Sequence, residues 1–286
     1  MSRIAYVNGR YVPHSDARVH IEDRGYQFAD GVYEVCEIWR GHLVDETRHL
    51  DRLERSTREL LIPMPMARSA LRLVLREVVR RNRVDHGLVY MQVTRGVSRR
   101  DHYFPPADTK PALVVTARST GPGKGDLMAR DGVSVITLPD NRWERVDIKS
   151  VGLLPNVLAK EKARSAGARE AWFIDRDGYV TEGASTTAWI VTSDGTLVTR
   201  PDGTQLLPGV TRLTAADVAR REGIRVDQRK FRVEEAKAAR EAFMTAASML
   251  IMPIVRIDGA LVSDGKPGPI ATRLRAAFHE VAEKLP

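Results

Sequence analysis

The sequence predicts an α+β protein of two domains, and three observations support this. The chain has 286 residues, 43% of them hydrophobic, a length at which one core commonly divides in two. Strand-like runs occur in hairpins beside isolated helices, which disfavours a doubly wound sheet. The segment "STGPGKGD" at 119–126 is rich in glycine and has no periodic apolar pattern, which is typical of a linker. We therefore expect a small N-terminal domain at 1–118 and a larger C-terminal domain at 127–286.

The first domain has the pattern of a small α/β unit. Two short apolar runs flank Asn8-Gly9, a strong two-residue hairpin signal. Strands are predicted at 31–40, 88–96 and 111–118, and amphipathic helices at 47–60 and about 67–83.

The second domain is predicted to be rich in strands. Period-two alternation and β-branched residues indicate strands near 133–137, 145–149, 171–175, 186–191, 225–229, 242–247 and 252–257. Helical spacing indicates helices near 154–165, 211–222 and 269–283.

Composition narrows the class of protein. The single cysteine, Cys36, excludes a disulfide framework or a cysteine-based zinc site and fits a reducing cytoplasm. No stretch approaches the roughly 20 apolar residues of a membrane helix, and the N-terminus lacks a signal-peptide pattern. The net charge of +8 is dispersed through amphipathic helices. We therefore expect a cytoplasmic protein that binds neither membrane nor nucleic acid, with a surface that favours small anions.

Lys149 is the first candidate for chemistry. It follows the alternating run Val146 to Ile148 and precedes an apolar stretch, so its amine is expected on an enclosed face. Desolvation lowers the pKa of a lysine, and a neutral amine attacks aldehydes to form a Schiff base. The alternative is a side chain that reaches solvent, or one that pairs with Asp147 or Glu161.

Three further segments carry polar candidates. Glu182 lies at a break between strands in "TEGASTTAWIV", where it is either a turn residue or a partner for a protonated ring nitrogen. "LLPGVTR" resembles a helix start, and the free amides near Val210 and Thr211 suit a phosphate. "VTRGVSRRDHYFPP" places Arg100 and His102 in a loop that either meets carboxylates or is only solvated. Metalloprotease HExxH and hydrolase GxSxG motifs are absent from the sequence.

Together these segments resemble the class IV aminotransferases, pyridoxal-phosphate enzymes of fold type IV, and within them the bacterial D-amino-acid aminotransferases. The resemblance spans essentially the whole chain. Its motifs occur in the family's order: "EDRGYQFADGVYEV", "HLDRL", "VTRGVSRRDHYFP", "DIKSVGLLPNVLAK", "TEGAST", "LLPGVTR" and "DGKPGP". The fold this implies has a strand-rich pseudo-barrel as its larger, cofactor-binding domain.

The resemblance also implies roles for the cofactor site. Lys149 would form the Schiff base with pyridoxal 5′-phosphate and act as general base and acid. Glu182 would pair with the pyridine nitrogen. Arg52, in "HLDRL", would bind the phosphate together with Val210 and Thr211.

The implied reaction moves an amino group from a D-amino acid, such as D-alanine, to a 2-oxo acid, such as 2-oxoglutarate, by ping-pong kinetics. Tyr33, Arg100 and His102 match the family's carboxylate-binding positions, and the loop carrying the last two would reach over from the partner of a homodimer. No metal is implied.

Two departures from the family pattern concern the hydroxyl groups around the cofactor. Thr187 stands where relatives often have asparagine, and Ala246 and Ala247 stand where hydroxyls near the phosphate are common. Ser248 is therefore a candidate for a rebuilt phosphate contact. Alternatives with the same fold are an L-branched-chain aminotransferase, an R-selective amine transaminase or an aminodeoxychorismate lyase. A different class would be a non-catalytic basic protein that binds nucleic acid.

Overall fold

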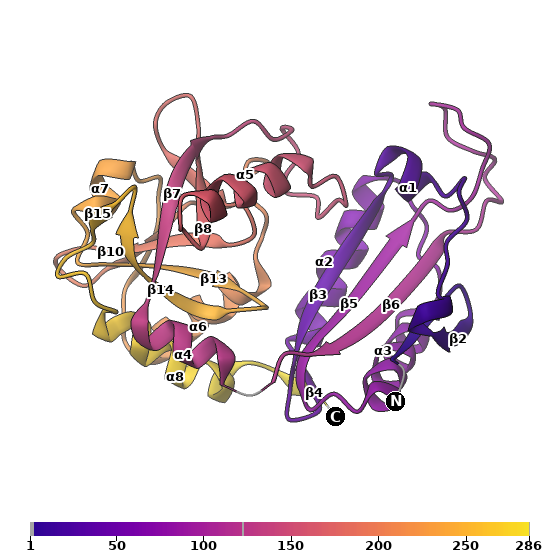
Figure 1. The fold of residues 1–286 in the computed structure, drawn as a ribbon, viewed down its shortest axis with the longest axis horizontal. Coiled ribbons are helices and arrows are strands. Elements are labelled where there is room, and N and C mark those ends of the chain that lie inside the picture. Colours follow the sequence, from indigo (N-terminus) through magenta and orange to yellow (C-terminus); the bar gives the residue numbers. More distant parts are fainter. Residues whose placement is uncertain (1–2, 122, 286) are drawn as a thin grey trace. The chain divides into compact units, whose positions relative to one another are not determined.

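The computed structural model describes residues 3–121 and 123–285, which form two compact units (Figure 1). Unit 1 contains residues 3–121 with the short segments 148–152 and 283–285, and unit 2 contains 123–147 and 153–282. Each unit combines a sheet with helices, which confirms the expected α+β class.

Unit 1 is built on a seven-stranded sheet of order β16-β4-β3-β5-β6-β1-β2. Its core combines side chains of α2 and α3 with one face of this sheet. The elements are β1 (Ile4–Val7), β2 (Arg10–Pro13), the short 3-10 helix η1 (His14–Asp16), α1 (Arg24–Phe28), β3 (Gly31–Trp39), β4 (His42–Val44), α2 (Glu46–Glu59), α3 (Arg68–Asn82), β5 (His86–Thr94), β6 (Ala112–Ser119) and β16 (Lys284–Leu285).

Alternation along β3 sorts the residues of unit 1 between two faces. Val32, Glu34 and Cys36 are fully buried, whereas Tyr33 and Val35 between them are half-buried. Because side chains of a strand alternate between faces, Tyr33 lies on the face opposite the helices. Strand β3 therefore presents the polar residue Glu34 to the core and the aromatic residues Tyr33 and Trp39 to the opposite face.

Unit 2 is built on a nine-stranded mixed sheet of order β12-β11-β10-β13-β14-β7-β8-β9, with β15 paired to β14. The sheet curls, as expected of a pseudo-barrel (Figure 1). The elements are α4 (Lys124–Asp131), β7 (Val133–Pro139), α5 (Leu154–Ser165), β8 (Glu170–Ile174), β9 (Val180–Gly183), β10 (Thr187–Val191), β11 (Leu197–Thr199), α6 (Val210–Arg221), β12 (Val226–Gln228), α7 (Val233–Lys237), β13 (Glu241–Ala246), β14 (Leu250–Ile257), β15 (Ala260–Leu261) and α8 (Pro269–Val281).

The prediction of a strand at 145–149 is wrong. Residues 145–149 form turns and bends without a partner strand. The chain passes from unit 2 to unit 1 between Asp147 and Ile148, so consecutive residues satisfy different surroundings. Ile148 enters the core of unit 1, whereas Asp147 pairs with Arg145. The alternation of apolar and polar residues at 145–149 therefore arises from these separate environments and not from one face of a sheet.

Helix α4 was not predicted, and it begins at Lys124 within the segment interpreted as a linker. The predicted hairpin at Asn8-Gly9 is confirmed by the pairing of β1 with β2. Both turn residues have positive φ, 45° and 93°, which asparagine and glycine tolerate best.

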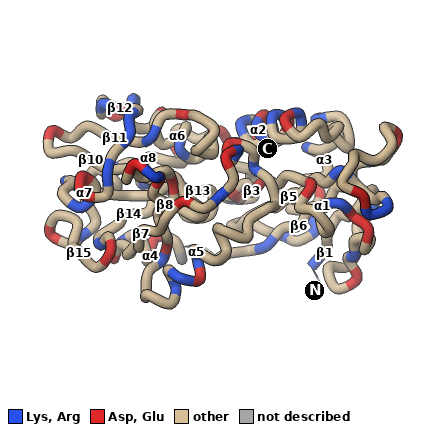
Figure 2. Tube along the Cα trace, turned by 90° about the horizontal axis from the view of Figure 1, so that it is seen from above, with Lys and Arg blue, Asp and Glu red and all other residues tan. Residues whose placement is uncertain are grey.

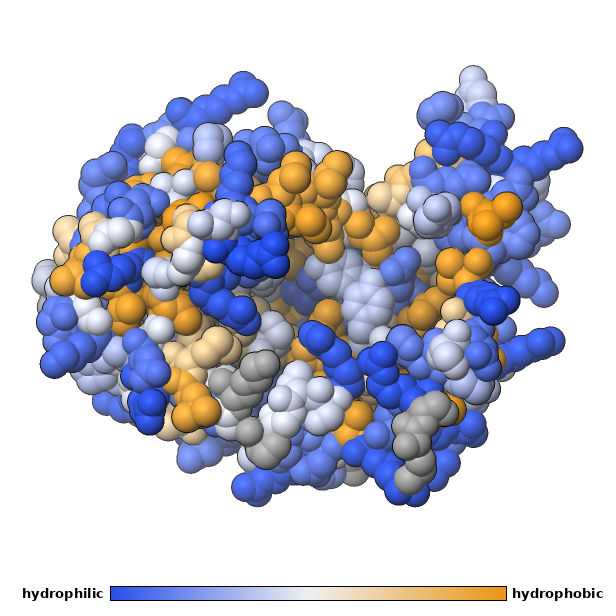
Figure 3. Space-filling view, in the orientation of Figure 1, coloured by the Kyte–Doolittle hydropathy of each residue, from blue (hydrophilic) through white to orange (hydrophobic). Residues whose placement is uncertain are grey.

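The surface carries both signs of charge. Figure 2 shows lysine and arginine interspersed with aspartate and glutamate along the trace. Apolar side chains also reach the surface of both units in the view of Figure 3. None of the helices formed by residues 3–121 and 123–285 is both long and apolar enough to cross a bilayer.

Candidate active site

Lys149 is anchored by its backbone to unit 1. Its amide donates to Ser56 Oγ at 3.3 Å, and its carbonyl accepts from the Tyr33 amide at 3.0 Å. The side chain is half-buried, and Nζ lies 4.1 Å from the centre of the Tyr33 ring. The amine therefore has a defined position on an aromatic face, although the strand predicted to carry it does not form.

Arg52 lies on α2 in a buried ionic cluster of unit 1. Its Nε and Nη2 donate to the two oxygens of Glu34 at 2.7 and 2.8 Å, and His49 Nδ1 lies 2.7 Å from Glu34 Oε2. Burial alone would raise the pKa of Glu34, but Arg52 and His49 lower it to about 2. The carboxylate is therefore ionised and holds the plane of the Arg52 guanidinium.

The candidate substrate-binding residues of unit 1 fall into two groups. Tyr33 stacks on Tyr90 with ring centres 5.7 Å apart. Arg100 and His102 are exposed and share Phe28 of α1: the guanidinium lies 4.5 Å and the imidazole 5.6 Å from its ring centre. The structure thus brings Arg100 and His102 together and places Tyr33 beside Lys149.

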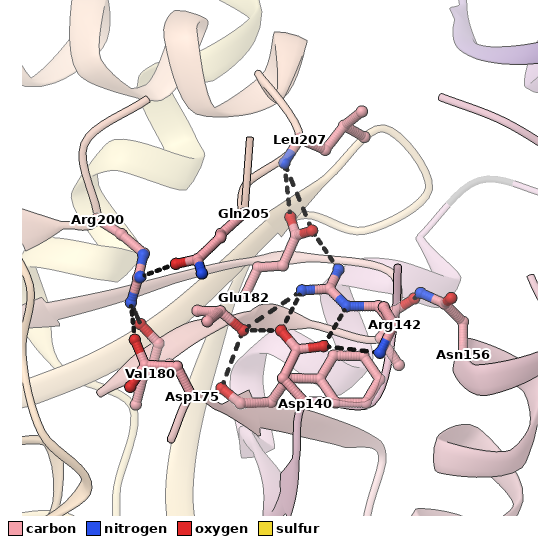
Figure 4. Close-up of polar contacts among 12 residues, drawn as sticks. Asp140, Arg142, Asn156, Asp175, Val180, Glu182, Arg200, Gln205 and Leu207 are labelled. Atoms are coloured by element: carbon pink, nitrogen blue, oxygen red, sulfur yellow. Dashed lines mark hydrogen bonds and ion pairs between the residues drawn. The ribbon is translucent and has the colours of Figure 1, made fainter. Parts of the chain in front are cut away.

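Glu182 lies in β9 at the centre of a polar network of unit 2 (Figure 4). Arg142 Nη1 donates to Glu182 Oε1, while Arg142 Nε and Nη2 donate to the carboxylate of Asp140 at 2.9 and 2.7 Å. The Thr181 hydroxyl donates to Asp140 at 2.7 Å. The amide of Leu207 approaches the two Glu182 oxygens at 3.4 and 3.3 Å.

This network contains two carboxylates and one guanidinium. Burial raises the pKa of Glu182 above its ordinary value, although Arg142 opposes the shift. The pKa of Asp140 is lowered, because the hydrogen bonds and charge of Arg142 outweigh the effect of burial. The charge of Glu182 is therefore less fully compensated than that of Asp140, and an additional cation nearby would stabilise the ionised form of Glu182 more.

The N-terminus of α6 forms a second polar feature of unit 2. Helix geometry leaves the amides of Val210 and Thr211 without intrahelical acceptors. A Cβ added at Gly209 would lie 2.8 Å from Thr187 Oγ1, which places that hydroxyl beside the helix start. This arrangement suits an anion.

Ser248 lies in the turn between β13 and β14 and is exposed. Ala247 lies in the same turn and has no side-chain donor. Thr186 Oγ1 is buried and has no hydrogen-bond partner within 3–121 and 123–285. Unit 2 therefore has hydroxyl groups that could donate to a ligand in two places: Thr186, close in sequence to Glu182, and Ser248 in the turn.

Sequence reasoning missed Arg142, Asp140 and Glu34. A signal for Glu34 was present, because it occupies an inward position of the alternating run "GVYEVCEIW". Arg142 and Asp140 lie in an irregular polar loop, and their partners Thr181 and Glu182 come from β9. No local pattern indicates such contacts.

The comparison with known proteins identifies the class. Residues 31–257 match the amino-transferase class IV family, so the chain belongs to that family. Class IV aminotransferases depend on pyridoxal phosphate, and this chain is a pyridoxal-phosphate-dependent aminotransferase.

Individual relatives extend over nearly the whole chain. A D-alanine aminotransferase of Staphylococcus haemolyticus is 37% identical over 97% of both chains. One of Listeria innocua is 39% identical over 96% of this chain and 94% of its own. A solved branched-chain amino acid aminotransferase of Escherichia coli is similar in structure, with a TM-score of 0.89 and 25% identity over 98% of this chain and 95% of that one.

Each unit, taken by itself, contains groups of the kinds that this cofactor requires. Glu182 is a buried carboxylate. Among residues 3–121 and 123–285, its Oε2 accepts a hydrogen bond from the Leu207 amide at 3.3 Å. The start of α6 and the buried Thr186 hydroxyl supply donors of the kind a phosphate requires. Lys149 supplies a primary amine held on Tyr33.

Proposed function

We propose that this chain is a D-amino-acid transaminase that moves the amino group of D-alanine, or a similar donor, to a 2-oxo acid such as 2-oxoglutarate. The D-alanine aminotransferases that resemble it over nearly its full length support this substrate class. The observation that carries the proposal is the position of Lys149. Its amine lies 4.1 Å from the centre of the ring of Tyr33, which is itself a candidate for binding the substrate carboxylate. We place the enzyme in the cytoplasm, where its buried free thiol, Cys36, stays reduced.

Lys149 is the proposed catalytic base and acid. Pyridoxal phosphate, when bound, supplies an aldehyde for the amine and a protonated ring that withdraws electrons from the substrate Cα. Lys149 Nζ would take the proton from the substrate Cα as a base and would then act as the acid that delivers it to the cofactor side, so that the same nitrogen serves both directions of the exchange. The hydrogen bonds from the backbone of Lys149 to Ser56 and Tyr33 keep the residue in position for this transfer.

Glu182 and the phosphate-binding residues would hold the cofactor. Glu182 would accept a hydrogen bond from the ring nitrogen and keep that nitrogen protonated. Arg52, whose plane is fixed by Glu34, would bind the phosphate with the amides of Val210 and Thr211, and Ser248 would add a hydroxyl. The orientation of Arg52 by two hydrogen bonds supports this role, since a prearranged donor loses less entropy on binding.

Tyr33, Arg100 and His102 are the proposed clamp for the substrate carboxylate, with Arg100 and His102 contributed by the partner of a homodimer. The two side chains are exposed on one loop, and Tyr103 and Phe104 beside them are 83% and 59% exposed. Large aromatic side chains that reach solvent are typical of interfaces. These exposures support a loop that reaches a second copy of the chain.

Hybrid dimers test this arrangement. Lys149→Ala and Arg100→Ala subunits, each inactive with amino acids, are unfolded, mixed and refolded together. If Arg100 acts across the interface, each hybrid has one intact site, and the mixture regains about a quarter of the wild-type activity. If Arg100 serves its own subunit, the mixture stays inactive and the proposal of a shared site fails.

Substrate preference is tested with paired donors. The purified enzyme is incubated with 2-oxoglutarate and either D-alanine or L-alanine, and pyruvate is measured; L-leucine is tested in parallel. We expect pyruvate from D-alanine at least a hundredfold faster than from L-alanine. Rapid reaction of L-leucine with no pyruvate from D-alanine would instead place the chain with the branched-chain enzymes that its fold also resembles.

A further inference from the structure

We propose that Arg142, held in place by Asp140, is a positioning residue that keeps the Glu182 carboxylate ionised and occupies its Oε1, so that Oε2 is the oxygen that bonds the protonated ring nitrogen of pyridoxal phosphate. The proposal rests on the assignment of Glu182 to the ring nitrogen. It adds a residue that touches neither substrate nor cofactor.

Asp140 fixes the direction of the Arg142 guanidinium. Three nitrogens of Arg142 donate to Asp140: the backbone amide at 3.2 Å, Nε at 2.9 Å and Nη2 at 2.7 Å. The guanidinium also stacks on the Phe173 ring at 4.5 Å, and the side chain is 5% exposed. With Nε and Nη2 engaged, Nη1 points to Glu182 Oε1, as Figure 4 shows. A planar group held in this way has little freedom to turn.

The charge of Arg142 favours the ionised form of Glu182. Burial favours the neutral acid and raises the pKa of Glu182, and Arg142 is the main group that opposes this. Without Arg142, Glu182 would share a buried site with Asp140, and two nearby carboxylates disfavour ionisation further. A protonated Glu182 cannot hold a proton on the ring nitrogen, because it has no negative charge to stabilise it.

The two oxygens of Glu182 have unequal surroundings. Oε1 accepts from Arg142 Nη1, whereas the bond that Oε2 accepts from Leu207 is long, at 3.3 Å. The network of Asp140, Arg142 and Glu182 has one negative charge in excess. A pyridinium at Oε2 would bring the buried cluster to neutrality, which is the condition under which buried charges are tolerated.

The test measures cofactor binding to the apoenzyme, with two ligands and six proteins. The ligands are pyridoxal 5′-phosphate and its deaza analogue, which has carbon in place of the ring nitrogen. The proteins are the wild type, Arg142→Met, Arg142→Lys, Glu182→Gln, the double variant Arg142→Met/Glu182→Gln, and Arg145→Met. Arg145 is the matched control, because it lies in the same loop and pairs bidentately with Asp147 at 3.0 and 3.1 Å.

We expect Arg142→Met to raise the Kd for pyridoxal phosphate about tenfold, or about 1.4 kcal/mol, and to leave the Kd for the deaza analogue within twofold. Arg142→Lys keeps the positive charge and should lose less affinity for pyridoxal phosphate than Arg142→Met. Arg145→Met should bind both ligands like the wild type. In the Glu182→Gln background, adding Arg142→Met should weaken binding no further, because the two residues act as one unit.

Three results would overturn the proposal. One is an Arg142→Met variant that binds pyridoxal phosphate like the wild type. Another is an equal loss for both ligands, which indicates a general structural defect. A third is additive losses in the double variant, which would mean that Arg142 acts without Glu182. If instead the wild type binds both ligands equally, the fault lies in the assignment of Glu182 to the ring nitrogen, and if D-alanine fails as donor, only the substrate class is wrong.

Discussion

The glutamate–arginine pair Glu34–Arg52 of unit 1 and the pair Glu182–Arg142 of unit 2 are both buried, yet they have opposite properties. In unit 1 the pKa of Glu34 is lowered to about 2, whereas in unit 2 the pKa of Glu182 is raised. Both carboxylates are nearly inaccessible, at 0% and 5% exposed. Burial is therefore not the difference between them.

The difference lies in how the arginine is shared. Arg52 gives two donors to Glu34, and His49 adds a third contact, so both oxygens accept short hydrogen bonds. Arg142 gives Nε and Nη2 to Asp140 and only Nη1 to Glu182. A carboxylate whose charge is fully compensated stabilises the fold, and one that is partly compensated is suited to bind another cation.

The largest expected effect that separates the pairs is on catalysis. Glu182→Gln removes the charge that, in our proposal, keeps the ring nitrogen protonated, so kcat/KM should fall by about a hundredfold to a thousandfold. The free energy of unfolding of the apoprotein should change by less than about 1 kcal/mol, because the charge removed was poorly compensated. Steady-state kinetics and urea unfolding measure both. A large loss of stability with little loss of activity would assign Glu182 to the fold.

The second effect is on stability. Glu34→Gln leaves Arg52 buried without its counter-charge, and the free energy of unfolding should fall by about 3 kcal/mol. His49→Gln, which keeps the Arg52 pair, should lose less. Urea unfolding of the apoproteins checks this. If Glu34→Gln is as stable as the wild type, the pair in unit 1 is not the stabilising element that we describe.

The smallest effect is a difference in pH dependence. The folded pKa of Glu34 lies below its ordinary value of 4.5, so its contribution to stability is present above pH 4.5 and is lost as the pH falls toward 2. The folded pKa of Glu182 lies above the ordinary value, so its contribution is present below pH 4.5 and is lost as the pH rises through that folded pKa.

Urea-unfolding midpoints from pH 2 to pH 7 measure both slopes. The difference between wild type and Glu34→Gln should shrink as the pH is lowered. The difference between wild type and Glu182→Gln should change in the opposite direction. Parallel curves for the two variants would contradict the comparison.

Local patterns predicted most of the elements. The amphipathic helices at 68–82, 154–165 and 210–221 match the predicted ranges closely, because their apolar spacing is continuous over several turns. Asn8-Gly9 marked its hairpin because few other residue pairs tolerate two positive φ values. The strand at 145–149 failed where the chain changes units within a few residues.

Long-range contacts account for the part of the site that was missed. Lys149, Arg52 and Glu182 stand in motifs, and their roles remain predictions that rest on the resemblance. Arg142 meets Glu182 across 40 positions of sequence, and the Leu207 amide meets it across 25. Such contacts depend on the order of strands in a sheet, which no spacing within the loop specifies.

The proposed roles of Glu182 and Arg142 require that the aldehyde of pyridoxal phosphate joins Lys149. Borohydride reduction of the yellow holoenzyme, followed by peptide mass spectrometry, tests this directly. The account predicts that the visible absorbance is lost and that a phosphopyridoxyl group is found on the peptide containing Lys149. A label on another lysine, or no label on a protein saturated with cofactor, would contradict it.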